Sequence, residues 1–202
     1  MAQSASEKFS RRWFLKGSGA AAAAASSLAT GAGVVAAQQE ESAVVSGWTT
    51  ISLQVNGKTH QVKVEPRTTL LEVLRYQLDL TGAKPVSMDG SSGASTVLVD
   101  GKPITASTTL ALSVQGKAIQ TAEALGGDDP DAVPRAFVHS DAQQCGFCTP
   151  GFVVAVRAFL NKHPQATVDE IRNGLSSNLC RCGTYADVLE AVLSVAKGGG
   201  NG

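Results

Sequence analysis

The segment that decides the fold reads Gln144-Cys145-Gly146-Phe147-Cys148-Thr149-Pro150-Gly151, and it is completed further along the chain by Asn178-Leu179-Cys180-Arg181-Cys182-Gly183. These two motifs contain all four cysteines of the 202-residue chain, spaced as Cys-x2-Cys and Cys-x-Cys. Each spacing places two sulfur atoms close enough to share one metal centre, because thiolates are the ligands of iron–sulfur clusters and of structural zinc. The sequence therefore predicts one site built from both motifs.

The spacing of the cysteines leaves three kinds of site open: a [2Fe-2S] cluster, a structural zinc ion or two disulfides. Cys-x-Cys is less usual for zinc than a spacing of two to four residues, which favours iron. Spacing alone does not decide among the three.

Helical patterns surround the two cysteine motifs. Four short helices are predicted, at 131–140, 150–163, 167–176 and 184–197. Pro150 suits the first turn of its helix, and Thr167 with Glu170 has the spacing of a capping box. We therefore expect a helical domain over 131–197, with each cysteine pair at a helix end.

An earlier block, residues 49–125, has the pattern of a sheet. Asn56-Gly57 and Asp100-Gly101 lie at the centres of two predicted hairpins, and a last strand is predicted at 118–121. A helix is predicted from Thr69 to Leu80, between the hairpins. This block is a small α+β domain, and a Gly-, Asp- and Pro-rich linker at 126–130 separates it from the helical one.

Four serines occupy positions in the sheet block where cysteines would form a second metal site. Ser87, Ser92 and Ser95 are spaced as S-x4-S-x2-S, and Ser107 follows. With cysteine at each position this would be a plant-type ferredoxin loop. A hydroxyl is a harder and far less acidic ligand than a thiol, so we expect no cluster there. Serines in a Gly-rich loop are otherwise ordinary turn residues.

The N-terminus carries an export signal. Ser10-Arg11-Arg12-Trp13-Phe14-Leu15-Lys16 is a twin-arginine motif, and residues 17–37 are mostly Ala, Gly and Ser. Such a stretch is too weakly apolar for a membrane anchor, so residues 1–37 are a cleaved signal and the protein is expected in the periplasm with no stable anchor. A linker at 38–48 and a disordered tail at 198–202 complete the chain.

Composition limits the partners of the chain. The 17 basic and 17 acidic residues give no net charge, and no basic cluster lies outside the signal, so nothing suggests nucleic acid as a partner.

We find no Ser-His-Asp set, carboxylate pair or phosphate-binding loop. Substrate turnover is therefore expected in a partner protein.

The two cysteine motifs resemble those of the iron–sulfur subunit of the molybdenum hydroxylases, the xanthine dehydrogenase and aldehyde oxidoreductase family. The resemblance covers nearly all of the mature chain, and the twin-arginine signal makes it most like the small subunit of periplasmic aldehyde oxidoreductases. It implies a β-grasp ferredoxin-like domain with a distal cluster, followed by a four-helix domain with a proximal cluster. It also implies a molybdopterin-binding large subunit, together with an FAD-binding subunit or another electron acceptor.

Site residues follow from the same resemblance. Cys145, Cys148, Cys180 and Cys182 match the proximal-cluster ligands, and Gln144 matches a glutamine that approaches the partner's pterin. The four serines fall on the distal-cluster ligands, so the chain has one [2Fe-2S] cluster. Either all four cysteines were deliberately replaced or the distal centre was lost naturally; the retained loop register favours replacement or late loss. The competing hypothesis is a non-redox scaffold with zinc or disulfides.

Overall fold

The computed structural model describes residues 44–198. The predicted signal, most of the linker at 38–48 and the tail after Gly198 lie outside these residues. Within them, no helix combines the length and the apolar character needed to cross a membrane.

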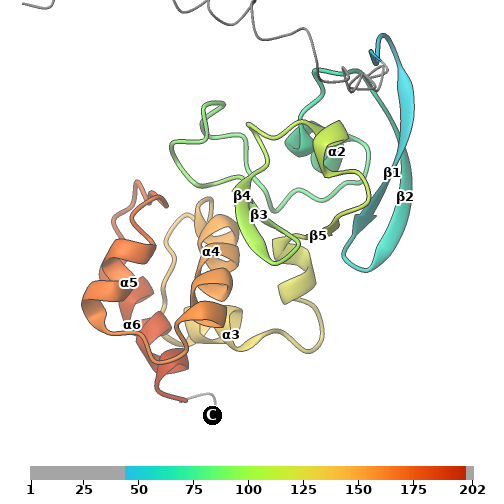
Figure 1. Cartoon of the computed structure of the whole chain (residues 1–202). Coiled ribbons are helices and arrows are strands. Elements are labelled where there is room, and N and C mark those ends of the chain that lie inside the picture. Colours follow the sequence, from blue (N-terminus) through green and yellow to red (C-terminus); the bar gives the residue numbers. More distant parts are fainter. Residues whose placement is uncertain (1–43, 199–202) are drawn as a thin grey trace, which may run out of the picture. The chain divides into compact units, whose positions relative to one another are not determined.

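Five strands form one mixed sheet in the order β2-β1-β5-β3-β4 (Figure 1). The strands are β1 (Thr49–Val55), β2 (Lys58–Val64), β3 (Thr96–Val99), β4 (Lys102–Thr105) and β5 (Ala118–Gln120). β1 pairs with β2 antiparallel and with β5 parallel, while β3 pairs antiparallel with β4 and β5. The central parallel pair joins two hairpins into the sheet expected of a β-grasp domain.

Both predicted hairpin turns are confirmed. Asn56 and Gly57 have φ angles of 50° and 76°, and Asp100 and Gly101 have 49° and 73°. Two successive left-handed residues form the type of turn that follows the twist of antiparallel strands. Asn56 also fixes the turn to the rest of the sheet, since its side chain exchanges two hydrogen bonds of 2.9 Å with Thr121.

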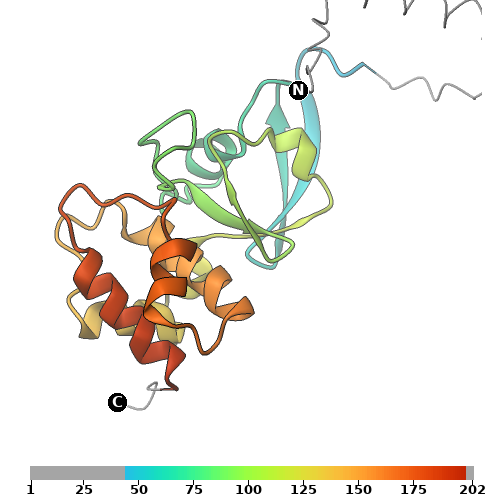
Figure 2. The same ribbon diagram turned by 60° about the vertical axis from the view of Figure 1, so that its left-hand side comes forward.

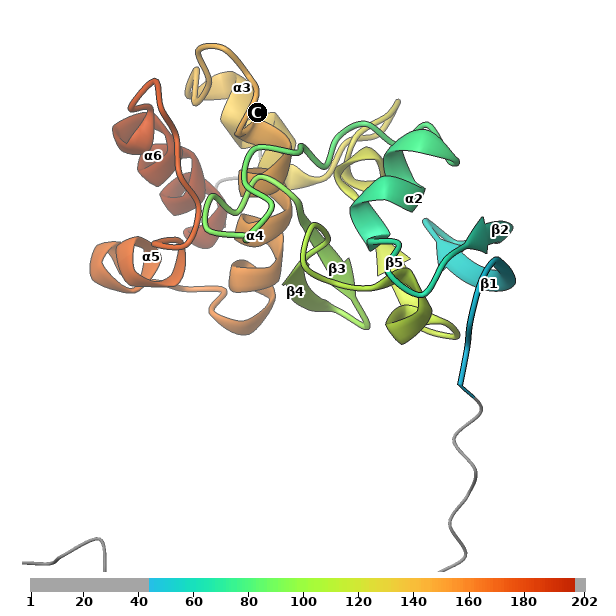
Figure 3. The ribbon, with the colours of Figure 1, turned by 90° about the horizontal axis from the view of Figure 1, so that it is seen from above.

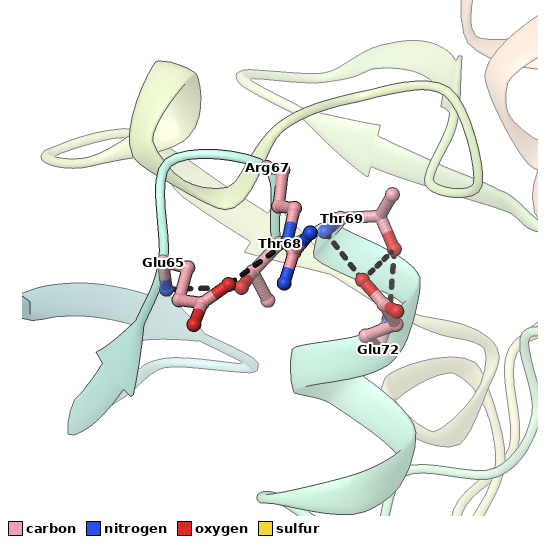
Figure 4. Close-up of polar contacts among 5 residues, drawn as sticks. All are labelled: Glu65, Arg67, Thr68, Thr69 and Glu72. Atoms are coloured by element: carbon pink, nitrogen blue, oxygen red, sulfur yellow. Dashed lines mark hydrogen bonds and ion pairs between the residues drawn. The ribbon is translucent and has the colours of Figure 1, made fainter. Parts of the chain in front are cut away.

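Helix α2 (Leu70–Tyr76) begins at a capping box, as predicted, but ends before Leu80. The carboxylate of Glu72 accepts hydrogen bonds from the backbone N–H and the hydroxyl of Thr69 (Figure 4). At the other end, Asp79 has a φ of 55°, and the Arg75 guanidinium donates hydrogen bonds of 2.8 Å to carbonyls beyond that turn. The chain reverses at Asp79, and the backbone N–H of Leu80 donates a bond of 2.8 Å to the Leu74 carbonyl, so the helix ends earlier than predicted.

Four helices follow the sheet, as predicted. They are α3 (Ala132–His139), α4 (Thr149–Lys162), α5 (Val168–Gly174) and α6 (Tyr185–Ala196), which gather beside the sheet in Figure 2. α4 begins one residue before Pro150, and the Thr167–Glu170 capping box opens α5. Two short 3-10 helices, η1 (Ala111–Val114) and η2 (Ala122–Leu125), were not predicted.

Two groups of buried side chains stabilise the described residues. One lies between the sheet and α2 and includes Leu53, Leu70 and Val97. The other surrounds α4 and includes Phe152, but it also takes in Leu98 of β3. All four residues of β3 are buried, because one face of the strand packs in each group. Thus α4 packs against the sheet mainly at β3 and also at β4, which Figure 3 shows from above.

Candidate metal centre

The four cysteines lie on two loops beside the helix ends. Cys145 is in the loop between α3 and α4, and Cys148 is the N-cap residue of α4. Cys180 and Cys182 lie between α5 and α6. All four are free thiols; Cys180 is buried, Cys148 is half-buried, and the other two are exposed. The predicted position of each pair at a helix end is therefore observed.

Folding pairs the thiols across the two motifs. The Cys145 thiol has Cys182 as its neighbour and the Cys148 thiol has Cys180, and each neighbour contributes to the pKa shift of the other. Within residues 44–198, no three His, Cys, Asp or Glu side chains lie close enough together to hold a single ion. Two thiol pairs match the ligand arrangement of a two-iron cluster, in which each iron takes two protein ligands. The donor set therefore fits the predicted [2Fe-2S] group.

In the buried pair, one thiolate is favoured over the other. Burial of Cys180 favours its neutral thiol, but hydrogen bonds from the hydroxyl and backbone of Thr184 and from Cys148 outweigh this and lower its pKa to about 7. Burial is also the main effect on Cys148, where it raises the pKa to about 12. Of the two thiols of this pair, Cys180 is therefore the one whose thiolate, the metal-binding form, is favoured.

The exposed pair has the same asymmetry. A hydrogen bond from the backbone N–H of Phe147 lowers the pKa of Cys145, and the bond shared with Cys182 lowers it further. For Cys182, the backbone N–H of Cys145 lowers the pKa, but the bond shared with the Cys145 thiol and the nearby thiolates outweigh it and raise the pKa. Each pair thus combines one favoured thiolate with one favoured thiol.

Large apolar side chains are exposed around the cysteines. Phe147 is 50%, Leu179 53% and Tyr185 48% exposed. Gln144, the predicted pterin neighbour, is also exposed and directly precedes Cys145. The sequence reasoning missed the apolar residues, because an apolar residue beside a ligand is as readily buried as exposed. Exposed apolar groups in one region are typical of a surface that a partner protein covers.

The four serines pair with one another. We call residues 87–95 the serine loop. The hydroxyl oxygens of Ser87 and Ser92 lie 2.7 Å apart, and those of Ser95 and Ser107 lie 3.0 Å apart. Folding therefore brings the predicted positions of the distal ligands together two by two. Among the described residues, the buried side-chain atoms without a hydrogen bond belong to Arg75, Thr149 and Arg157. The hydroxyls of the four serines are therefore hydrogen-bonded in two pairs.

Comparison with known proteins identifies the family. A family model described as "[2Fe-2S] binding domain" matches residues 121–193, and the twin-arginine signal model matches residues 8–29. The aldehyde oxidoreductase iron-sulfur-binding subunit PaoA of Escherichia coli K12 is 41% identical over 162 residues, covering 72% of this chain and 71% of that protein. A nicotinate dehydrogenase subunit of Pseudomonas putida is 41% identical over 150 residues, covering 74% and 96%.

Solved structures agree with the sequence comparison. The crystal structure of quinoline 2-oxidoreductase from Pseudomonas putida 86 matches with a TM-score of 0.72 and 38% identity, covering 75% of this chain and 96% of that one. Aldehyde oxidoreductase from Desulfovibrio desulfuricans matches with a TM-score of 0.70 and 35% identity, but the match covers only 17% of that larger chain.

The chain belongs to the family of small iron–sulfur subunits of the molybdenum hydroxylases. The α+β fold and the family resemblance predicted from the motifs are confirmed. The protein is an exported electron-transfer subunit of an oxidoreductase complex, and its twin-arginine signal directs it to the periplasm. Membership of this family implies that its partner is a molybdopterin-binding large subunit.

Proposed function

We propose that this chain carries electrons away from its large subunit through one [2Fe-2S] cluster held by Cys145, Cys148, Cys180 and Cys182. The observation that carries this proposal is the pairing of thiols across the two motifs. Each pair takes one cysteine from the loop before α4 and one from the segment between α5 and α6. Such a cluster supplies one-electron storage when bound, and the chain supplies its four thiolates.

The exposed surface around the cysteines is the proposed docking site of the large subunit. Gln144 would approach the pterin there, since it is exposed next to Cys145. Phe147, Leu179 and Tyr185 would be covered by the partner, which explains why large apolar groups face water in the isolated chain. Electrons then leave for an FAD-binding subunit or another acceptor, and the cleaved chain has no stable membrane anchor.

Two domains divide these tasks in the proposal. A β-grasp domain over 49–125 is joined by the linker at 126–130 to a helical [2Fe-2S]-binding domain over 131–197. Four serines in place of the family's distal ligands leave the first domain without a cluster, since hydroxyls are poor ligands for iron–sulfur centres.

Aldehydes are the proposed substrates of the complex. Similarity to PaoA, whose name gives an aldehyde oxidoreductase, supports this class. The nicotinate dehydrogenase subunit of Pseudomonas putida is equally identical, so an N-heterocycle is the second candidate. The complex co-purified from its source organism is assayed with an aldehyde and with an N-heterocycle, and the class that it oxidises faster is its substrate class.

The ligand assignment is tested by metal analysis. Full-length protein, made and purified anaerobically in cells that assemble clusters, is expected to contain about two irons and two acid-labile sulfides per chain. Cys145→Ala and Cys182→Ala should each lose most of this iron, because each removes one thiolate ligand. Ser113→Ala is the matched control, since this exposed serine lies in η1 and its hydroxyl bonds only to the Leu110 carbonyl. A colourless protein with stoichiometric zinc, or with two disulfides, would contradict the assignment and support a scaffold.

A further inference from the structure

The serine loop is hydrogen-bonded directly to the segment that carries Cys180. The carbonyl of Gly93 accepts a bond of 3.1 Å from the Asn178 side-chain amide, and the carbonyl of Ser92 accepts one of 3.0 Å from the backbone N–H of Leu179. Asn178 is only 4% exposed, so its amide has little access to water. Both bonds end within two residues of Cys180, where a shift of the main chain would move the thiol.

The same loop also packs against the helix that begins at Cys148. A Cβ atom placed on Gly151 of α4 would lie 2.6 Å from the carbonyl oxygen of Gly93. A Cβ atom on Gly93 would lie 2.7 Å from both the Asn178 amide nitrogen and the carbonyl oxygen of Ser177. The serine loop therefore lies between the two cysteine motifs, with backbone approaches that only glycine allows. Figure 3 shows the loop before β3 beside α4 and beside the segment between α5 and α6.

Hydrogen bonds between serines hold the loop in this shape. Ser87 accepts a bond of 3.0 Å from the backbone N–H of Ser92, in addition to the contact between their hydroxyls. Ser95 pairs with Ser107, which lies beyond β4, and accepts a bond from the backbone N–H of that residue. Thr96 donates a bond of 2.6 Å to the Gly93 carbonyl. Buried bonds of this kind, all with partners, favour one backbone arrangement.

We propose that the serine loop is a positioning element for the cluster site, and that Asn178 transmits its position to Cys180. This inference rests on the proposed function, because it takes Cys180 as a cluster ligand. The four serines fix the loop, the Ser92 and Gly93 carbonyls fix the backbone at Asn178 and Leu179, and that backbone orients the thiol. The β-grasp domain thus acts on the remaining cluster through its shape and carries no electrons itself.

The test compares three variants of the full-length protein by electron paramagnetic resonance of the reduced cluster, by midpoint potential and by the rate of iron loss to a chelator. Asn178→Ala removes the amide bond to Gly93, and Ser107→Ala removes the hydroxyl paired with Ser95. Both should alter the spectrum of the reduced cluster. Both should also shift its midpoint potential in the same direction, because hydrogen bonding and exposure around the sulfurs set the potential. Both should also lose iron about tenfold faster than wild type.

Asn56→Ala is the matched control. It removes two hydrogen bonds of the first hairpin and destabilises the same domain away from the serine loop. It should lower the unfolding temperature while leaving the cluster's spectrum and potential unchanged. If Asn178→Ala does not fold, Ser107→Ala decides the matter, since it leaves both cysteine motifs intact.

Wild-type spectrum, potential and chelation rate in the folded variants would overturn the inference while leaving the proposed function standing. About four irons per wild-type chain would also overturn it, because the loop would then hold a second cluster. A wild-type protein without iron and sulfide would overturn the proposed function and the inference together.

Discussion

Replacing Gly151 with alanine adds one methyl group where α4 meets the serine loop. The new Cβ would lie 2.6 Å from the Gly93 carbonyl oxygen and 3.0 Å from the Cα atom of Ala94. Both contacts are with backbone, so no side chain can rotate away to relieve them. Either the loop or the first turn of α4 must move.

Two effects of opposite sign determine the magnitude. Alanine is favoured over glycine by up to about 1 kcal/mol in a helix interior, and by less in a first turn. Insertion of a methyl group into a packed region costs about 1–3 kcal/mol, and the backbone contacts place Gly151→Ala in the upper part of that range. We expect a net loss of about 1–2 kcal/mol in the free energy of unfolding. For a chain of this size, this lowers the unfolding temperature by roughly 2–8 °C.

Thermal unfolding followed by circular dichroism measures the change, with Gly126→Ala as the control. Gly126 has a φ of −99°, and a Cβ there would meet no atom closer than 3.8 Å, so this variant should unfold within about 1 °C of wild type. Gly151→Ala should also lose iron faster, because α4 begins at Cys148. A Gly151→Ala protein as stable as wild type would refute the close contact between α4 and the serine loop.

Three further predictions concern other parts of the chain. Thr167→Ala removes the N-cap of α5 and should cost about 1 kcal/mol of unfolding free energy in urea titration, whereas equal stability would mean that the capping box contributes nothing. Lysine at both Arg11 and Arg12 should leave the protein in the cytoplasm in cell fractionation; periplasmic delivery of that variant would contradict twin-arginine export. Replacing Ser87, Ser92, Ser95 and Ser107 with cysteine should add a second [2Fe-2S] signal in electron paramagnetic resonance, and an unchanged spectrum would mean that the loop no longer has the geometry of a cluster site.

Local sequence signals predicted most of the secondary structure. The Asn56-Gly57 and Asp100-Gly101 turns, both capping boxes and all four helices of the second block depend on neighbouring residues, and the sequence contains those neighbours. The predicted end of α2 at Leu80 was wrong. The chain reverses at Asp79, and Arg75 donates hydrogen bonds to carbonyls beyond that reversal. Pairing of the thiols across the motifs depends on how α4 packs against the later helices, which no local pattern encodes.

The serine loop shows a second limit of sequence reasoning. From the sequence alone, its retained Gly-rich register favours replacement or late loss, since a loop without a cluster is expected to drift. The structure gives a different reason to keep it: Gly93 has no room for a side chain against Asn178, and Ser95 pairs with Ser107. A loop that packs against both cysteine motifs is constrained whether or not it ever held a cluster, so its register says little about when the ligands changed.

The central claim is one [2Fe-2S] cluster on thiolates from both motifs, and quantitative electron paramagnetic resonance tests it most directly. Reduced, anaerobically purified protein should give one signal that integrates to about one spin per chain, with about two irons and two acid-labile sulfides. Two distinguishable signals with about four irons, or a protein that contains zinc and no sulfide, would contradict it.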